Sequence, residues 1–453
     1  MHSKYNQITK YKNYFLFLTL FTISFFIIDK SPSFFDLLQP DSDEYLSGKQ
    51  SRTIVYHFIL KISENLNLDI VCFQKILLSL SIVSLLFFLK EQKVNNYILV
   101  IFFLLINLNY FYTSFSKTIL PESIFFSLIN FAIINLFRLK RFSSFISFGL
   151  LLGFIYSIKP IGMAVSVLMF FFSLLFNQNL KNFFFTGLFF LIPILVESYL
   201  FNLKNDQRDT IFKYSVVGKL FLLSGEKNFH INKYPDNLHL LLTKTKDEFT
   251  KVHNFLDDIE DTLLQKELLS DFEVIAQFQT FKLNSVKSLD FDEKILYKNY
   301  KQLAYLILKN NFREYFFLSI DHYIGNWSIG SKLRFLNNLN TKEEIPMYDE
   351  LLKSSGKMNT PDLALIILAQ IFFLILFLTL TLKTLILLYE LFQKNIKSIK
   401  LHDLFYITLS QIYLLSISFT NVSSPRYLMT IYPILIIILL SFVNLFFNQQ
   451  KKI

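Results

Sequence analysis

The sequence predicts an all-α polytopic membrane protein with about ten transmembrane helices and a mostly helical extracytoplasmic domain between spans seven and eight. Three observations predict this class. The 453 residues are 53% hydrophobic, include 55 Phe and have a mean hydropathy of +0.41, which is too apolar for a soluble chain of this length. Apolar runs of the length that crosses a bilayer as a helix recur near both ends of the chain. A long polar segment separates the two groups of runs.

Seven apolar runs form the first transmembrane region, residues 1–203. A basic tail precedes the first run, and Asp29-Lys30-Ser31-Pro32 follows it in place of a small-residue cleavage site. We therefore expect a retained span rather than a removed signal peptide. The runs cover residues 14–28, 71–89, 96–112, 120–137, 143–157, 161–176 and 183–201.

The segment 204–361 contains no run long enough to cross a bilayer and is predicted to be a separate extracytoplasmic domain. Residues 246–273 carry apolar side chains at three- and four-residue intervals, the period of an amphipathic helix. Residues 292–323 show a similar pattern with a break at Asn310-Asn311. Three further apolar runs, 363–385, 401–419 and 427–447, form the C-terminal transmembrane region, residues 362–453.

The distribution of basic residues predicts that both termini are cytoplasmic, because cytoplasmic loops of membrane proteins carry an excess of Lys and Arg. With the N-terminus inside, the short outer connections carry only Lys117, Lys159 and Arg426 beyond the first loop. The inner loops carry Lys90, Lys93, Arg138, Lys140, Arg141, Lys181, Lys394, Lys397, Lys400, Lys451 and Lys452. This topology places the first loop, the 117–121 connection, the 159–160 turn, the large domain and the 421–426 connection on the outer face.

The first outer loop is the strongest candidate for chemistry, because residues 40–45 read Pro-Asp-Ser-Asp-Glu-Tyr and contain three carboxylates. A carboxylate at the end of a span is partly desolvated, which makes it a better general base than one in open water. Asp43 and Glu44 offer the hard oxygen ligands that Mg²⁺ or Mn²⁺ prefers. A polar turn in which Asp41 caps the following helix accounts for the loop equally well.

Three further polar elements share the predicted outer face. Glu122 follows Pro121 at the start of an apolar run; this placement suits a helix N-terminus, but an ionisable group there is also a site candidate. Lys159, before a proline, is either a snorkelling lysine or a phosphate contact. Arg426 opposes the charge rule, and its guanidinium matches phosphate oxygens with a bidentate fork. Pro433 is expected to kink the last span near that point.

Several classes of site are not expected. The seven His residues show no close metal-ligand spacing, so no structural zinc site is predicted. The single cysteine, Cys72, allows no intramolecular disulfide. The chain has no Gly-rich phosphate loop, which disfavours a nucleotide fold. The net charge of +10 is assigned to loops at the inner leaflet, and no nucleic-acid partner is expected.

The order of these motifs resembles the multi-span glycosyltransferases of the GT-C type, which include protein mannosyltransferases and bacterial aminoarabinose transferases. Segment 301–327, with Asn310-Asn311, Tyr315 and Trp327, is similar to the helical pair before the final spans of bacterial members. The resemblance covers most of the membrane part and little of residues 204–290. It rests on Pro40-Asp41 with Tyr45, Arg52 and Tyr56 further on, Glu122, Lys159-Pro160 where relatives often have Arg-Pro, and Arg426-Tyr427 with Pro433.

The resemblance implies an inverting enzyme that transfers a sugar from a polyprenyl-phosphate donor to an acceptor hydroxyl at the outer face of a bacterial inner (plasma) membrane. It implies that Asp41 is the catalytic base, with Tyr45 as its positioning partner. A divalent cation, Mg²⁺ or Mn²⁺, near Asp43, Glu44 or Glu122 is a candidate cofactor. The acceptor is a lipid, a glycan or a protein. The residues implied in substrate or phosphate binding are Tyr45, Arg52, Tyr56, Glu122, Lys159, Arg426 and Tyr427.

Two departures from the family pattern leave alternatives open. Many relatives have an adjacent Asp-Glu pair, so aligning Tyr45 selects Asp41 as the base, whereas aligning the pair selects Asp43; we expect Asp41. Lys159 keeps the positive charge of the family arginine but cannot make its bidentate contact. Two other functions also fit a chain with many spans and a large outer segment. They are an O-antigen polymerase or ligase, and a flippase or transporter of lipid-linked sugars.

Overall fold

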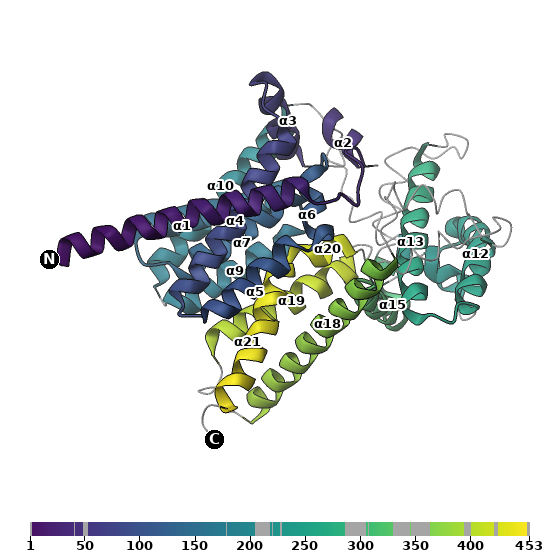
Figure 1. The fold of residues 1–453 in the computed structure, drawn as a ribbon. Coiled ribbons are helices and arrows are strands. Elements are labelled where there is room, and N and C mark those ends of the chain that lie inside the picture. The colour runs from purple at the N-terminus through teal and green to yellow at the C-terminus, as the bar shows by residue number, and fades with distance from the viewer. Residues whose placement is uncertain are drawn as a thin grey trace.

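The computed structural model describes residues 2–39, 41–48, 53–177, 179–203, 218–219, 221–226, 229–285, 305–306, 308–328, 345, 363–393, 400–420 and 425–450. Within these ranges the regular secondary structure is helical, with no β-strand, which confirms the all-α class. Figure 1 shows two groups of helices, with both chain termini on the side away from the smaller group. We call the smaller group, between residues 218 and 328, the polar domain.

The larger group is formed by helices from both ends of the chain. Its N-terminal part contains α1 (His2–Lys30), α2 (Ser42–Ser47), α3 (Ile54–Asn65), α4 (Ile70–Glu91), α5 (Asn96–Asn107), α6 (Tyr110–Ser114), η1 (Phe115–Lys117), α7 (Glu122–Phe137), α8 (Phe142–Ile158), α9 (Gly162–Asn177) and α10 (Leu180–Asn202). Its C-terminal part contains α18 (Leu363–Phe392), α19 (Leu401–Thr420), α20 (Pro425–Thr430) and α21 (Tyr432–Gln450). The polar domain contains η2 (Ile231–Lys233), α12 (Asp236–Asp257), α13 (Thr262–Ser285) and α15 (Phe312–Gly325).

The long apolar helices are those of a multi-pass membrane protein. In the part of the chain that the structure describes, four segments are long and apolar enough to cross a membrane: Tyr11–Lys30, Ile70–Glu91, Leu180–Asn202 and Ile367–Phe392. A fifth candidate is the pair Asn96–Asn107 and Tyr110–Lys117, which is bent by 53°. Helices α7, α8 and α9 and the segment Tyr432–Val443 of α21 are apolar but shorter.

Each predicted apolar run lies on helix, and two of the runs are broken. The run 96–112 breaks between α5 and α6, where the side chain of Asn109 accepts a hydrogen bond from the Tyr112 backbone N–H at 3.1 Å and so starts a new helix. The run 427–447 breaks at Ile431, directly before Tyr432-Pro433, because proline suits the first turn of a helix and not its interior.

Helices α8 and α10 lie unusually close together because two glycines of α8 face α10. A Cβ atom on Gly149 would lie 2.5 Å from the Thr186 carbonyl oxygen, and one on Gly153 would lie 2.5 Å from the Phe190 carbonyl oxygen. Small residues four positions apart allow this approach between membrane helices. The contact holds the end of α8, which leads into Lys159, against the rest of the bundle.

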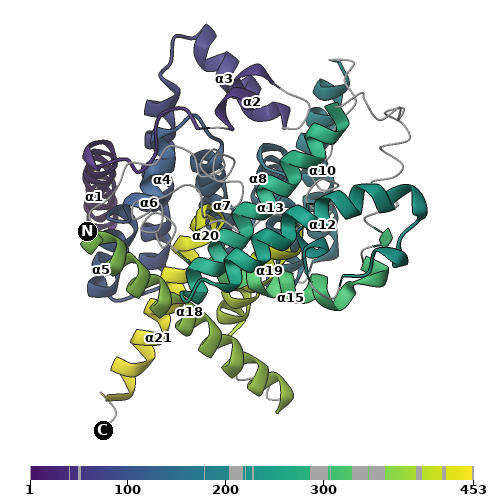
Figure 2. The same ribbon diagram turned by 90° about the vertical axis from the view of Figure 1, so that its right-hand side faces the viewer.

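The polar domain has its own hydrophobic core, to which α12, α13 and α15 contribute residues such as Phe249, Phe272 and Leu318. Figure 2 shows these helices lying in front of the larger group of helices. The single amphipathic pattern at 246–273 is divided, since α12 ends at Asp257 and α13 begins at Thr262. The Asp261 carboxylate accepts a hydrogen bond from the Leu264 backbone at 3.1 Å and starts the second helix. The break predicted at Asn310-Asn311 is confirmed, because α15 begins at Phe312; most of the rest of 292–311 lies outside the described residues.

Candidate functional site

Five residues selected from the sequence meet in one place, although four separate segments supply them. Asp41 is at the N-cap position of α2, Glu122 is the first residue of α7, and Lys159 follows the last residue of α8. Arg426 and Tyr427 belong to α20. We call these five residues the Asp41 cluster.

The charged members of the Asp41 cluster form a chain of alternating charges. Arg426 Nη1 lies 3.0 Å from Asp41 Oδ2 and 3.9 Å from Glu122 Oε1, and Lys159 Nζ lies 2.7 Å from the same Glu122 oxygen. The side chains of Glu122 and Lys159 are only 3% and 9% exposed, whereas those of Asp41 and Arg426 are 25% and 29% exposed. The Glu122–Lys159 pair is therefore the buried floor of the cluster, and Asp41 with Arg426 is its open end.

Tyr427 provides an aromatic surface for both cations. Lys159 Nζ lies 4.9 Å from its ring centroid, and the Arg426 guanidinium carbon lies 5.4 Å from it. The ring is buried. Cations above an aromatic face are attracted by the ring quadrupole, so Tyr427 helps to hold two positive groups near one another.

Glu122 has one oxygen available for a ligand. Among the described residues no donor reaches Glu122 Oε2, although this atom is buried. A buried carboxylate oxygen without a hydrogen-bond donor is costly. A hydroxyl or amide group of a bound molecule would satisfy it. The cluster therefore offers a cation, an available acceptor and a solvent-accessible carboxylate within one small region.

Two hydrogen bonds fix Asp41 relative to Glu122. Ser42 Oγ donates to the Ile119 carbonyl at 3.0 Å, and the Ile119 N–H donates to the Leu37 carbonyl at 2.9 Å. The first loop is therefore bound to the connection that leads into α7. Asp41 makes no capping hydrogen bond within α2, so the capping role does not account for its position.

The turn that carries Lys159 is equally constrained. The Gly162 N–H donates to the Lys159 carbonyl at 2.8 Å, and a Cβ on Gly162 would lie 2.5 Å from the Ile155 carbonyl oxygen. Thr53, just before α3, donates its hydroxyl to the Ile158 carbonyl at 2.7 Å. Only a residue without a side chain allows α9 to start so close to the end of α8, and this directs Lys159 toward Glu122.

Tyr45 and Tyr56 pack on each other beside the cluster. Their rings meet edge to face with 5.3 Å between centroids, and both are buried. The Tyr56 hydroxyl donates to Gln74 at 3.3 Å, and Gln74 donates to the Thr118 carbonyl at 2.8 Å. Burial and then the negative charge of Glu122 raise the pKa of Tyr56, which keeps its hydroxyl a donor. Arg52, also selected from the sequence, lies outside the described residues.

The predicted divalent cation stays a prediction. Asp43 is exposed on α2, and Glu44 is partly buried one residue further on. In the described parts of the chain, no three His, Cys, Asp or Glu side chains gather as metal ligands. Both carboxylates of the Asp41 cluster already contact a cationic side chain. Glu122, one of the three predicted ligands, is thus already paired with Lys159.

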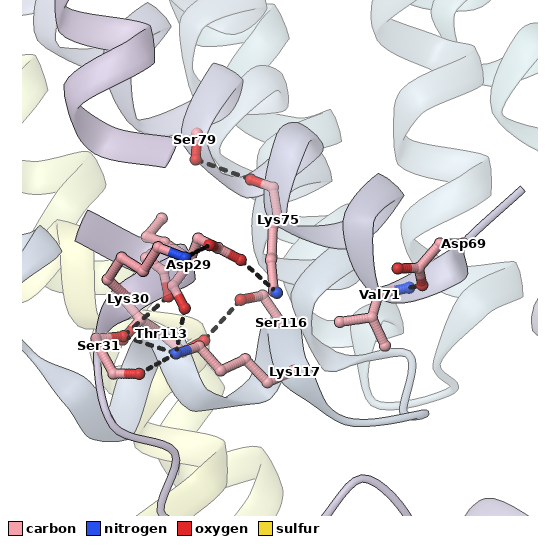
Figure 3. Close-up of polar contacts among 11 residues, drawn as sticks. Asp29, Lys30, Ser31, Asp69, Val71, Lys75, Ser79, Thr113, Ser116 and Lys117 are labelled. Atoms are coloured by element: carbon pink, nitrogen blue, oxygen red, sulfur yellow. Dashed lines mark hydrogen bonds and ion pairs between the residues drawn. The ribbon is translucent and has the colours of Figure 1, made fainter. Parts of the chain in front are cut away.

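Lys117 belongs to the same connection as Glu122, but its contacts lie at the end of α1 and not in the Asp41 cluster (Figure 3). Its ammonium donates to the backbone carbonyls of Asp29 and Ser31 and to the Ser31 hydroxyl at 3.0 Å. Lys75 lies 2.8 Å from the Asp29 carboxylate. These contacts bind the end of α1 to α4 and η1, since basic groups favour the last carbonyls of a helix.

Sequence reasoning missed one buried polar cluster in the polar domain. Lys219 and Glu273 form a fully buried ion pair at 2.8 Å, and His322 Nε2 contacts the same carboxylate. Ser270 Oγ lies 2.9 Å from His322 Nδ1. The connectivity is that of a Ser-His-acid triad, but burial denies it access to substrate. These residues are spread over about a hundred positions, so no local pattern in the sequence indicates them.

Comparisons of the chain with protein-family models, with curated proteins and with solved structures found no match.

Proposed function

We propose that this protein is an integral-membrane glycosyltransferase of the GT-C type, which transfers a sugar from a polyprenyl-phosphate donor to an acceptor hydroxyl. The observation that supports the proposal is the meeting of Asp41, Glu122, Lys159, Arg426 and Tyr427 in one cluster. All five were selected from the sequence for this reaction, and they come from segments up to 385 residues apart.

In the proposed topology all ten apolar runs cross a bacterial inner membrane, with both termini cytoplasmic and the Asp41 cluster on the outer face. Helix α7 has 16 residues and a rise of roughly 24 Å, somewhat less than the hydrocarbon core of about 30 Å. Its flanking residues complete the crossing. A donor with its isoprenoid tail in the bilayer then presents its phosphate and sugar at the level of the cluster.

The proposed chemistry assigns one role to each charged group. The Asp41 carboxylate takes the proton of the acceptor hydroxyl, whose oxygen forms a bond to the anomeric carbon with inversion. The bond from that carbon to the phosphate oxygen breaks, and the phosphate leaves with the electron pair. Arg426 and Lys159 stabilise the leaving phosphate, because cations aimed at developing charge lower the barrier. Glu122 holds both cations in place and offers Oε2 to a sugar hydroxyl.

The polar domain is proposed to select the acceptor, a lipid, a glycan or a protein. It is the main part of the described chain outside the membrane-type helices, and it carries its own core. No step of the proposed reaction passes through a metal ion, because the cluster's carboxylates contact cations of the chain itself.

The deciding experiment incubates the purified full-length protein in lipid nanodiscs with radiolabelled polyprenyl-phosphate sugars and a mixture of lipid and glycan acceptors. We expect labelled product with the wild type and with Asp43→Asn, and a loss of about 10²–10⁴-fold with Asp41→Asn. A well-inserted Asp41→Asn variant with full activity would refute Asp41 as the base. Transbilayer movement of the labelled lipid without covalent transfer would identify a flippase, and elongation of a glycan chain would identify a polymerase or ligase.

A further inference from the structure

Helix α15 belongs to the polar domain by sequence but makes two sets of contacts. Tyr315 and Leu318 are part of the polar-domain core. The helix also bonds to α19, because Tyr315 donates its hydroxyl to the Phe419 carbonyl and Tyr323 donates to Gln411 at 2.9 Å. Figure 1 shows α15 at the border between the two groups of helices. It is therefore packed directly against α19, the helix that carries the predicted apolar run 401–419.

The contacts of α15 and of the residues just after it lie well inside α19 and α18, away from the ends of these helices on the polar-domain side. Gln411 lies nine residues before Thr420, the end of α19 on the polar-domain side, which is roughly 13 Å along the helix axis. Just after α15, the ring of Trp327 lies 5.2 Å from that of Phe377. Phe377 is ten residues into the candidate span Ile367–Phe392, roughly 15 Å from its start. The C-terminal end of α15 thus reaches the depth of the apolar layer.

The first two turns of α15 expose three phenylalanines. Phe312, Phe316 and Phe317 are 60%, 40% and 55% exposed. The ring of Phe316 lies 5.8 Å from that of Phe419 in the last turn of α19, so this exposed face is continuous with α19. The Arg313 guanidinium lies 5.7 Å from the Phe317 ring and is exposed as well.

This combination is costly in water and favourable at a membrane surface. Exposed aromatic side chains gathered on one face are uncommon in soluble domains. Aromatic side chains are favoured at the boundary between headgroups and acyl chains, and basic side chains beside them reach the lipid phosphates. A protein partner that covered this face would not have to lie at a fixed height relative to the membrane spans. A bilayer lies at a fixed height, and the contacts of Tyr323 with Gln411 and of Trp327 with Phe377 set the height of α15 relative to it.

We propose that α15 is an interfacial helix whose Phe312, Phe316 and Phe317 insert into the leaflet beside the polar domain, with Arg313 at the phosphates of its phospholipids. The partner is the phospholipid bilayer. The helix binds the polar domain to the membrane surface at one height. This inference is independent of the proposed reaction, because it uses no residue of the Asp41 cluster.

The test uses fluorescence, since Trp327 is the only tryptophan of the chain. In a Trp327→Phe chain, three variants each carry one new tryptophan: Phe317→Trp on α15, Leu374→Trp on the exposed side of α18 as a lipid control, and Glu248→Trp on the exposed side of α12 as a water control. Each is placed in nanodiscs with or without brominated phosphatidylcholine, and its folding is checked by size-exclusion chromatography and circular dichroism.

We expect brominated lipid to remove about half of the emission at positions 317 and 374 and little at 248. Iodide in the water should quench position 248 most. Equal quenching by bromine at 317 and 248 would overturn the proposal. Protection of 317 from both bromine and iodide would also overturn it, because a protein surface, such as a second copy of the chain, would then cover the face.

A second measurement keeps the proposal falsifiable where replacement of Trp327 disturbs folding. A nitroxide is attached to Phe317→Cys in a Cys72→Ala chain, which has no other cysteine. Greater collision with oxygen than with a water-soluble nickel chelate supports insertion. The reverse order refutes it.

Discussion

Asp41 and Arg426 lie 385 residues apart in the chain and form an ion pair with 3.0 Å between Oδ2 and Nη1. The pair joins the two ends of the protein at the open end of the Asp41 cluster. It also occupies the guanidinium that the proposed reaction needs for phosphate. An arriving donor phosphate would therefore compete with Asp41 for Arg426 and release the carboxylate toward the acceptor.

Two substitutions of Arg426 should distinguish the contribution of its positive charge from that of its bidentate contact with phosphate. We expect Arg426→Gln to lower the rate constant of transfer by about 10²–10³-fold, because the leaving phosphate loses a positive partner. Arg426→Lys should lose less, since it keeps the charge and loses only bidentate contact. Initial rates with increasing donor concentration distinguish a change in kcat from one in KM. Equal activity of all three proteins would exclude a role for Arg426 in transfer.

Loss of Glu122 alone should destabilise the protein, and the additional loss of Lys159 should restore stability without restoring activity. Glu122→Gln leaves a buried ammonium without its carboxylate and should cost about 3–5 kcal/mol of stability. The double variant Glu122→Gln/Lys159→Met should recover most of that loss, because a buried pair replaced by neutral groups is often nearly neutral. Transfer should remain impaired in the double variant. Thermal unfolding in detergent and activity measured on the same samples check both points, and restored activity would assign the pair a purely structural role.

Tyr427 meets the cations through its ring and also bonds to Arg426 through its hydroxyl, and two substitutions separate these contributions. Tyr427→Phe keeps the aromatic face 4.9 Å from Lys159 Nζ and removes only the hydroxyl's bond to Arg426, so it should lose less activity than Tyr427→Leu. Tyr427→Leu removes the face and should weaken donor binding, with a loss of about 1–2 kcal/mol in affinity as the two cations separate. Isothermal titration with a soluble polyprenyl-phosphate analogue measures the difference. Equal losses in both variants would point to the hydroxyl instead.

The close contact between α8 and α10 should not tolerate a methyl group. Gly153→Ala brings a Cβ within 2.5 Å of the Phe190 carbonyl oxygen and should cost about 1–3 kcal/mol. Gly187→Ala is the matched control, because its Cβ would meet only a phenylalanine ring edge at 3.3 Å. Detergent unfolding of the two variants gives the comparison. A Gly153→Ala protein as stable as the control would show that the helices can separate without cost.

The polar domain should lose stability as the pH falls. Burial, with the charge of Lys219, lowers the pKa of His322 below its ordinary 6.5, so the unfolded chain takes up a proton that the folded domain does not. Burial raises the pKa of Glu273, but Lys219 and His322 outweigh it and hold the pKa below 4.5, which adds a further loss in stronger acid. The free energy of unfolding therefore decreases as the pH falls below about 6.5.

Thermal unfolding followed by Trp327 fluorescence at about pH 7.5 and pH 5 measures this decrease. His322→Gln should reduce the difference between the two pH values, although it lowers stability at both, and His253, whose pKa burial also lowers, should account for part of what remains. His230→Gln, at an exposed position, should leave the difference unchanged. A wild-type midpoint that is the same at both pH values would contradict the prediction.

Patterns of apolar and charged residues in the sequence predicted the features of the structure that depend on local sequence. The apolar run 71–89 became α4 (Ile70–Glu91), since length and composition alone set a span. Charge placed Asp41, Glu122, Lys159 and Arg426 on one predicted face, and they meet. Which cation joins which carboxylate depends on tertiary packing and was not predictable.

Other features depend on contacts between distant residues. The amphipathic period at 246–273 continues through the point where Asp261 starts a new helix, so the pattern does not reveal the break. The Lys219–Glu273 pair leaves no periodic signal. The spacing of Gly149 and Gly153 does carry a signal, because small residues four apart mark close packing between membrane helices, and it could have been used.

The two carboxylates and two cations of the Asp41 cluster sum to zero charge. In the proposed reaction Asp41 gains a proton, so the cluster becomes positive by one. In the same step the phosphate changes from a diester to a monoester and gains one negative charge. The total charge at the cluster therefore does not change during transfer, and Arg426, no longer facing an anionic Asp41, becomes fully available to the dianion as it forms. Chemistry that keeps its charge constant needs no counter-ion from the water, which suits a site beside a bilayer.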